Sequence, residues 1–171
     1  TTDLALYLCR SVVGQQLSGA AARTIWARLE AALDCQGAEL PARCRPAAMA
    51  RIRSSGVSGA KARALLGIRE ASRSGLLDEA LAATDRAERD ARLREIWGVG
   101  QWTCDMVSIF YCKDPDVWPL GDSSVQRAFR IFVGEQAGDD RHERFAPWRS
   151  ILTMHLYRYL DDPVPVDPQA R

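Results

Sequence analysis

The fold of this chain is decided by one short stretch, LREIWGVGQWT, which occupies residues 93–103. Apolar residues recur with helical spacing on both sides of it, and Gly98 and Gly100 interrupt that spacing in the middle. Glycine lets the backbone turn tightly and approach another chain closely. The stretch therefore predicts two helices joined by a hairpin, with the second helix beginning directly after Gly100.

The start of that second helix has a chemical consequence. The first N–H groups of a helix have no partner inside it, and the helix dipole places partial positive charge there. A phosphate group fits such a position, so the hairpin is a candidate contact for a nucleic-acid backbone. A Gly-x-Gly sequence alone is also common in ordinary helical bundles. Here Leu93 and Ile96 before the turn, and Trp102 and Thr103 after it, make the stretch more specific.

The rest of the chain predicts an all-α protein. It has 171 residues, of which 47% are hydrophobic and 26% charged, so it can bury a sizeable core and is not a disordered chain. No apolar run is long enough to span a membrane, and no segment alternates as a strand would. We expect helices at about residues 4–13, 18–34, 47–53, 60–74, 76–83, 85–97, 101–112, 123–133 and 147–160, with loops at 34–46, 113–122 and 134–140.

Charge and cysteine content narrow the class further. Lys+Arg is 23 and Asp+Glu is 22, a net charge of +1, which excludes a histone-like binder but not a locally basic one. Residues 43–73 hold eight basic side chains and one acidic one, which suits either a phosphate-facing surface or a solvated helix face. The five cysteines match no zinc or iron–sulfur spacing. We expect buried thiols in a reducing, cytoplasmic setting.

Four separated motifs occur in order along the chain. They are VVGQQLS at residues 12–18, GVGQWT at 98–103, WPLGD at 118–122 and PWRS at 147–150. Together they resemble the helix-hairpin-helix DNA glycosylases that carry a Gly/Pro-rich loop ending in aspartate. The similarity is to the alkyladenine branch, of the bacterial 3-methyladenine DNA glycosylase II type. It extends from about Leu4 to Leu160.

The resemblance implies an architecture and an activity. The fold would be one glycosylase module over residues 1–160, with helical subdomains at about 1–117 and 118–160, an active-site cleft between them, and a flexible tail at 161–171. The enzyme would act in base excision repair. The enzyme would hydrolyse the N-glycosidic bond of a flipped-out alkylated base, such as 3-methyladenine or 7-methylguanine, and leave an abasic site. The partner would be damaged double-stranded DNA. The enzyme would be a monomer and would not bind a membrane.

Asp122 is the expected catalytic residue. It lies 22 residues after Gly100, where the resembling enzymes place an active-site aspartate. Breaking the N-glycosidic bond generates an oxocarbenium-like sugar, which a carboxylate beside C1′ can stabilise while it positions water. Asp122 also suits the N-cap of the next helix, and the two roles are compatible.

A lysine separates two mechanisms in the resembling family. Members that also cut the strand use a Schiff-base lysine two positions after the second hairpin glycine. This chain has Trp102 there, and its two lysines, Lys61 and Lys113, lie elsewhere. We therefore expect a hydrolase without AP lyase activity. It has no cysteine after Cys112, so we also expect no iron–sulfur cluster, no zinc and no required cofactor.

The resemblance also implies an aromatic base pocket that includes Trp102, Phe145 and Trp148. An aromatic face can stack on a cationic alkylated purine with about 0.5–2 kcal/mol of attraction. Trp148 alternatively packs in the core, on an apolar stripe of the last helix that also carries Ile151, Leu152, His155, Leu156 and Tyr159. Met106 and Ser123 occupy pocket positions that are frequently tyrosine in this branch. We hypothesise that their loss widens the pocket, so that 7-methylguanine and ethenoadenine are released as well as 3-methyladenine.

The remaining expectations concern DNA contacts. The phosphate would be taken by the hairpin, at Gly98, Val99, Gly100 and Thr103. Gln16 falls where the relatives insert a residue into the duplex after base flipping, although it also suits a residue bonded to the backbone at a helix start. A Na⁺ or K⁺ ion could be held by the carbonyls of three residues, Arg94, Ile96 and Val99. His142 and His155 are expected to be structural.

Two alternatives stay open. The same fold could act on other damaged bases, although the missing lysine argues against the lyase-type enzymes for oxidised purines. The hairpin could also serve a DNA-binding module without catalysis, which would need neither Asp122 nor the pocket aromatics.

Overall fold

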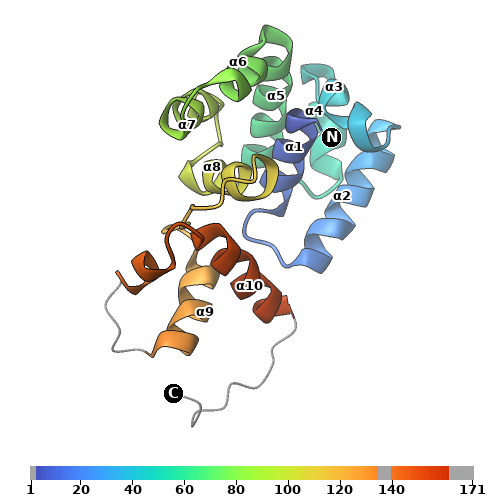
Figure 1. The fold of residues 1–171 in the computed structure, drawn as a ribbon. Coiled ribbons are helices and arrows are strands. Elements are labelled where there is room, and N and C mark those ends of the chain that lie inside the picture. The colour runs from blue at the N-terminus through green and yellow to red at the C-terminus, as the bar shows by residue number, and fades with distance from the viewer. Residues whose placement is uncertain (1–2, 135–139, 162–171) are drawn as a thin grey trace. The chain divides into compact units, whose positions relative to one another are not determined.

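The computed structural model describes residues 3–134 and 140–161, and within them every regular element is helical (Figure 1). The prediction of an all-α fold is confirmed. None of the described helices is long and apolar enough to cross a membrane. The α-helices are α1 (Leu4–Gly14), α2 (Gly19–Leu33), α3 (Leu40–Arg43), α4 (Met49–Ser54), α5 (Gly59–Ser74), α6 (Leu76–Ala82), α7 (Arg86–Arg94), α8 (Gln101–Met106), α9 (Ser123–Val133) and α10 (Arg149–Asp161).

Shorter elements lie between them. Residues Val107–Tyr111 continue α8 as a π-helix, and 3₁₀ turns occur at Gly37–Glu39, Pro46–Ala48 and Arg141–Phe145. The chain forms two compact units, Thr1–Val107 with α1 to α8, and Ser108–Arg171 with α9 and α10. The sequence suggested a boundary after residue 117.

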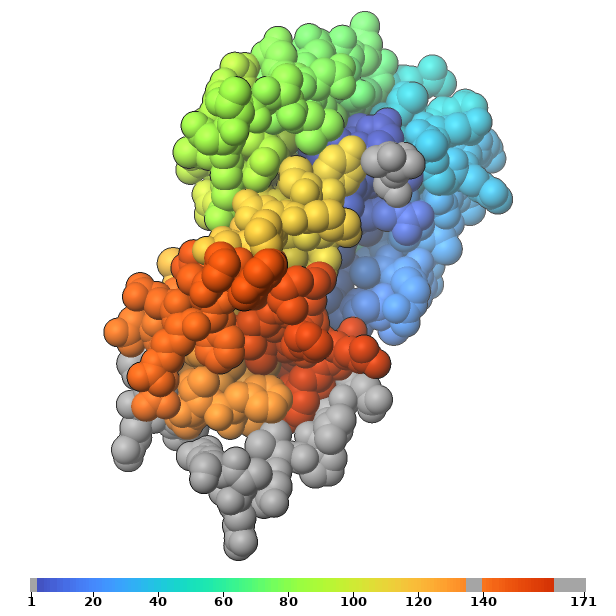
Figure 2. Space-filling model, viewed as in Figure 1, coloured from blue at the N-terminus to red at the C-terminus, as the bar shows by residue number. Residues whose placement is uncertain are grey.

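The first unit is built around α1. Leu8, Val12 and Val13 are almost fully buried on this helix, which packs against α5 and α2. Further along the chain α6 and α7 pack against each other, and their atoms form a continuous surface in the space-filling view (Figure 2, green). The apolar face of α1 therefore supports α5, the helix on which the hairpin lies.

The second unit has a core of its own. Trp118, Val125, Phe129 and Leu156 are buried together between α9 and α10. The Trp118 ring meets Phe129 edge-on at 5.0 Å and stacks on His142 at 4.9 Å. A loop that runs from Trp118 to the start of α9 is therefore anchored at its first residue. His142 has the structural role that the sequence suggested.

Side chains cap the helices where the sequence placed their starts. Ser18, Ser58, Asp85 and Asp122 each accept a hydrogen bond from the second or third N–H of the helix that follows. Gly75 ends α5 with φ +86°, a left-handed conformation that glycine adopts readily.

Three expectations about elements are wrong. Residues 34–46 are not all loop, because the short helix α3 begins there at the buried Leu40, with Pro41 in its first turn. The helix expected to reach residue 97 ends at Arg94, and a turn follows. The last helix begins at Arg149, after Pro147, and its buried face matches the expected stripe only in part: Leu156 is buried and Leu152 and Tyr159 pack against the core, but Ile151 and His155 do not.

That face carries Ser150, Thr153 and Leu156, whereas Ile151 and His155 are exposed. The buried hydroxyls have partners: Ser150 Oγ accepts from Val117 N, and Thr153 Oγ donates to the Arg149 carbonyl. Two polar residues can therefore face inwards on this helix. Of the expected tail, Asp161 belongs to α10, and residues 162–171 lie outside the described residues.

Candidate functional site

The predicted hairpin is present. Val99 N donates to the Ile96 carbonyl at 3.0 Å, which closes a tight turn, and Gly98 has φ +87°. Gly100 is extended and serves as the N-cap of α8, whose first helical bond runs from Cys104 N to Gly100 O at 3.1 Å. The backbone N–H groups that follow Gly100 therefore begin a new helix, as the sequence predicted.

The hairpin lies directly on α5. A Cβ atom on Gly98 would be only 2.8 Å from Ala64 Cβ, which is closer than real Cβ atoms approach. One turn further along α5, a Cβ on Gly67 would lie 3.4 Å from Ile96 Cγ2. Gly98 is thus required both by its backbone conformation and by the closeness of the helix beneath it.

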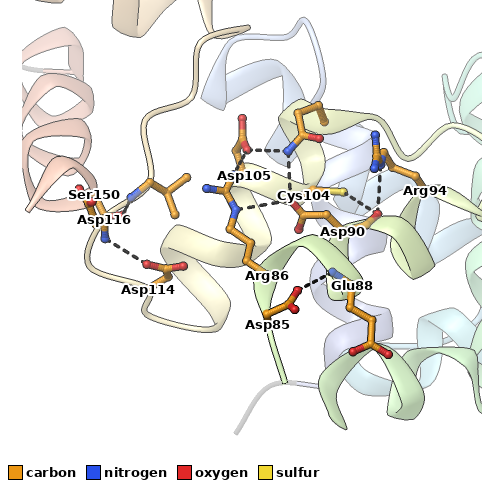
Figure 3. A network of polar contacts seen from close by, with 12 residues as sticks. Asp85, Arg86, Glu88, Asp90, Arg94, Cys104, Asp105, Asp114, Asp116 and Ser150 are labelled. Carbon is orange, nitrogen blue, oxygen red and sulfur yellow. Dashed lines mark hydrogen bonds and ion pairs between the residues drawn. The ribbon is translucent and has the colours of Figure 1, made fainter. Parts of the chain in front are cut away.

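A polar network around two buried carboxylates joins the two arms of the hairpin (Figure 3). Arg86 on α7 contacts Asp105 through Nη2 and Asp90 through Nε, at 2.5 and 3.4 Å. Gln101 Nε2 donates to both carboxylates, at 3.1 Å to Asp90 and 3.0 Å to Asp105. Burial raises the pKa of Asp105, and the bonds from Gln101 and Arg86 act in the opposite direction. The network fixes α8 against α7 and so fixes the turn between them.

The loop between α1 and α2 is held from two sides. Lys61 Nζ donates to the carbonyls of Val13, at 2.9 Å, and Gln15, at 2.7 Å. Gln15 Nε2 donates to Thr103 Oγ1 on α8 at 3.2 Å. Gln16 follows with φ +57° and an exposed side chain. The sequence did not reveal the role of Lys61. Its only signal was a lysine in a chain whose basic residues are otherwise almost all arginine.

The predicted contact residues of the first unit differ in exposure. Gly98 and Gly100 are exposed and Trp102 is half-buried, but Val99 is 5% exposed, Thr103 1% and Met106 4%. Thr103 Oγ1 is engaged by Gln15. The Thr103 hydroxyl thus has a partner inside the fold, and contact of phosphate with the hairpin backbone stays a prediction. Met106 is buried and its carbonyl accepts from Tyr7 Oη at 2.9 Å.

Asp122 stands at the end of the WPLGD loop. Asp122 N donates to the Pro119 carbonyl at 3.0 Å, so the loop closes as a turn, and the residue is 7% exposed. Its Oδ1 accepts from Val125 N at 2.8 Å, which confirms the expected N-cap. Its Oδ2 accepts from Tyr157 Oη at 2.5 Å. Both carboxylate oxygens are therefore oriented, one by the start of α9 and one by α10.

Tyr157 is the residue at this carboxylate that the sequence missed. It is 35 positions from Asp122, and its ring lies 6.0 Å from that of Phe110. The only sequence signal was its helical spacing from the buried residues Ser150 and Thr153.

Three more predicted pocket residues belong to the second unit. Ser123 is exposed at the first position of α9, Phe145 is 41% exposed, and Trp148 is 60% exposed. The alternative that Trp148 packs in the core is wrong, because the residue precedes α10 and does not share its buried face. Trp102 and Met106 belong to the first unit, so the grouping of all five residues in one pocket stays a prediction.

An ion pair fastens the segment before the WPLGD loop to the start of α10. Arg149 Nε and Nη2 donate to the two carboxylate oxygens of Asp116, at 2.6 and 2.7 Å. Next to it, Ser150 Oγ accepts from Val117 N, and Asp116 N donates to Asp114 Oδ1 (Figure 3). The PWRS motif therefore positions the loop that ends in Asp122.

This ion pair gives a pH-dependent prediction. The two hydrogen bonds from Arg149 lower the pKa of Asp116, so the pair stabilises the fold fully above about pH 5 and progressively less below the ordinary aspartate pKa of about 3.9. We expect Asp116→Asn to lower the free energy of unfolding in urea at pH 7. The difference from wild type should shrink at pH 3, because the carboxyl of the unfolded chain is mostly protonated there and unfolding is favoured by that proton. A difference of the same size at both pH values would contradict this.

The cysteines are free, as the sequence suggested. Cys9, Cys35, Cys44 and Cys104 are buried, and Cys112 is half-buried. Burial raises the pKa of Cys104 to about 12, so this thiol stays neutral.

At the hairpin, the Ile96 carbonyl accepts from Val99 N. The ion site at the Arg94, Ile96 and Val99 carbonyls stays a prediction.

The chain is similar to known DNA repair proteins. No family model matches it. It is 33% identical over 125 residues to DNA-3-methyladenine glycosylase 1 of Schizosaccharomyces pombe, a match that covers 72% of this chain and 55% of that protein. It is 31% identical over 176 positions to the probable bifunctional transcriptional activator/DNA repair enzyme AlkA of Mycobacterium tuberculosis, with 96% of this chain and 35% of that protein covered. The chain thus spans about half or less of these relatives.

Solved structures show the same fold. The S. pombe 3-methyladenine DNA glycosylase Mag1, in complex with abasic DNA, matches with a TM-score of 0.79 at 27% identity, over 95% of this chain and 83% of that one. A DNA-3-methyladenine glycosidase from Bacillus halodurans matches with a TM-score of 0.75 at 26% identity, over 93% and 76%. These sequence matches and solved structures together support the family that the motifs indicated, the helix-hairpin-helix DNA glycosylases of the alkyladenine type.

Proposed function

We propose that this protein is a DNA glycosylase that removes alkylated bases, of the 3-methyladenine and 7-methylguanine type, in base excision repair. The observation that carries the proposal is the carboxylate of Asp122. It follows the WPLGD loop of the family, is buried, and is oriented through both oxygens by Val125 N and Tyr157 Oη. A non-catalytic DNA-binding module would not need such an arrangement.

In the proposed reaction the glycosidic bond lengthens and positive charge develops on the sugar. The ionised Asp122 stabilises that charge and directs water to C1′. Alkylation makes the departing purine a good leaving group, so no strong acid is required. Because Trp102 replaces the lysine of the lyase enzymes, the product is an abasic site in an unbroken strand.

The proposed pocket is aromatic. Trp148 and Phe145 are exposed, and Trp102 is half-buried, so each has ring surface with which a base could stack. Because Met106 and Ser123 are smaller than tyrosine, we propose a pocket that also accepts 7-methylguanine and ethenoadenine.

DNA is the proposed partner. The backbone of the hairpin would take a phosphate, with an alkali cation on the Arg94, Ile96 and Val99 carbonyls. Gln16, exposed on a loop that Lys61 and Thr103 hold, would fill the gap left by the flipped nucleotide. Mag1, which was solved with abasic DNA, supports this partner.

The test is chromatography of the bases that the protein frees from methylated, ethenoadenine-containing and unmodified duplexes. We expect 3-methyladenine, 7-methylguanine and ethenoadenine from the damaged duplexes and no base from the unmodified one. Release of 3-methyladenine alone would reject the wider pocket. Release of no alkylated base would reject the glycosylase.

Tyr157→Phe tests how the carboxylate is held. The variant keeps the ring beside Phe110 but removes the hydroxyl that donates to Asp122. We expect kcat to fall about 10-fold, with KM and Tm nearly unchanged, because the catalytic carboxylate is held less well while the ring packing is kept.

Tyr159→Phe is the matched control on the same helix, since its ring packs on Phe132. In an Asp122→Asn background, Tyr157→Phe should have no further effect on the rate, because Tyr157 acts through that carboxylate. Equal losses in both backgrounds would show that Tyr157 does not act through Asp122.

A further inference from the structure

We propose that Arg63, stacked on Trp97, contacts a DNA backbone phosphate next to the one taken by the hairpin. This proposal rests on the proposed function, because it requires that duplex DNA is the partner. It assigns a role to two residues for which neither the catalytic site nor the hairpin backbone accounts.

The arrangement begins with an exposed ring. Trp97 directly precedes Gly98 and is 44% exposed, which is unusual for a tryptophan. The guanidinium carbon of Arg63 lies 4.3 Å from the centre of its ring. Stacking uses the flat face of the guanidinium and restricts its motion, while the N–H groups on its edge stay available. Such a group suits a phosphate, which accepts hydrogen bonds along that edge.

The pair is fixed to the hairpin. Arg63 is the neighbour of Ala64, against which Gly98 packs, and Gly67 on the same helix meets Ile96. The turn and this part of α5 therefore form one contact region within the first unit. A phosphate held at the turn would place the adjoining DNA backbone near the edge of Arg63.

The charge of Arg63 is not balanced locally. Among the described residues no carboxylate lies within ion-pair distance of it, whereas Arg69 and Arg73 on the same helix contact Glu70 at 3.8 and 3.2 Å. The guanidinium of Arg63 is thus exposed and held in place by the ring, and it is free to bind an anion. Next to a hairpin of this family, a phosphodiester is the anion that fits best.

The experiment measures Kd for an undamaged duplex and for one with a stable abasic analogue, over salt from about 50 to 200 mM. We expect Arg63→Gln to weaken binding about 5-fold at the middle of this range and to reduce the slope of log K against log salt by about one. Trp97→Leu should weaken binding less and keep the slope, because the charge remains.

Arg73→Gln is the matched control. It removes the same charge from the same helix, at a residue already paired with Glu70, and should leave both quantities close to wild type. An equal slope for Arg63→Gln and wild type, with both proteins folded, would overturn the proposal. Binding is measured without base release. If the wild-type protein frees no base but Arg63→Gln still reduces the slope, the proposed contact of Arg63 with DNA stands and the glycosylase activity is rejected.

Discussion

Asp122→Asn should lower the rate of base release about 1,000-fold under single-turnover conditions, because the charge opposite the developing oxocarbenium is lost. The cap of α9 is kept, because an asparagine oxygen can still accept from Val125 N and the side chain has the same size. The amide nitrogen takes the place of Oδ2, so Tyr157 Oη can no longer donate there. The measurement is the release of labelled base from methylated duplex with enzyme in excess.

Binding and stability provide the controls for this variant. We expect the Kd for a duplex with an abasic analogue to stay within about 3-fold of wild type, and Tm to stay within a few degrees, because neither the hairpin nor the core is altered. If wild type and Asp122→Asn release base equally fast, the catalytic assignment is wrong.

Gly98→Ala should lower the stability of the fold more than an added methyl group at the other hairpin glycine. Alanine would have to adopt φ +87°, and its Cβ would lie 2.8 Å from Ala64 Cβ. Backbone strain and overpacking together cost about 3 kcal/mol, which corresponds to a Tm lower by roughly 6–12 °C. Because the turn itself must shift, DNA affinity should fall as well. Thermal unfolding and duplex binding measure the two effects.

Gly100→Ala is the matched control. Gly100 has φ −103° and ψ −178°, which any residue adopts, and no atom lies within 4 Å of an added Cβ. We expect its Tm to stay within a few degrees of wild type. If the two variants were equally stable, the closeness of Gly98 to α5 would not matter for the fold.

Local patterns in the sequence predicted most of the helices. Capping side chains such as Ser58 and Asp85 act on N–H groups only a few residues away, so their effect can be read from neighbouring residues. The hairpin and the N-cap at Asp122 were found for the same reason. The short helix α3 was missed, because one buried leucine and one proline are too weak a signal against a loop-like composition.

Contacts between distant residues could not be predicted in this way. Lys61 reaches carbonyls 46 and 48 positions away, and Tyr157 reaches Asp122 over 35 positions. Nothing in a local pattern specifies such pairs, since they depend on how whole helices pack. The alternative of core packing for Trp148 was wrong for a related reason. Its spacing matched the next helix, but the helix begins one residue later, at Arg149.

The central claim is that this protein removes an alkylated base with Asp122 and leaves the strand intact. It is tested most directly with an end-labelled duplex that carries one 7-methylguanine, incubated with the protein and analysed with and without an AP endonuclease, which cuts at abasic sites and not at 7-methylguanine. We expect a strand break at the lesion only after the AP endonuclease is added, for wild type and not for Asp122→Asn. A break without the AP endonuclease, or no endonuclease-sensitive site with the wild-type protein, would contradict the account.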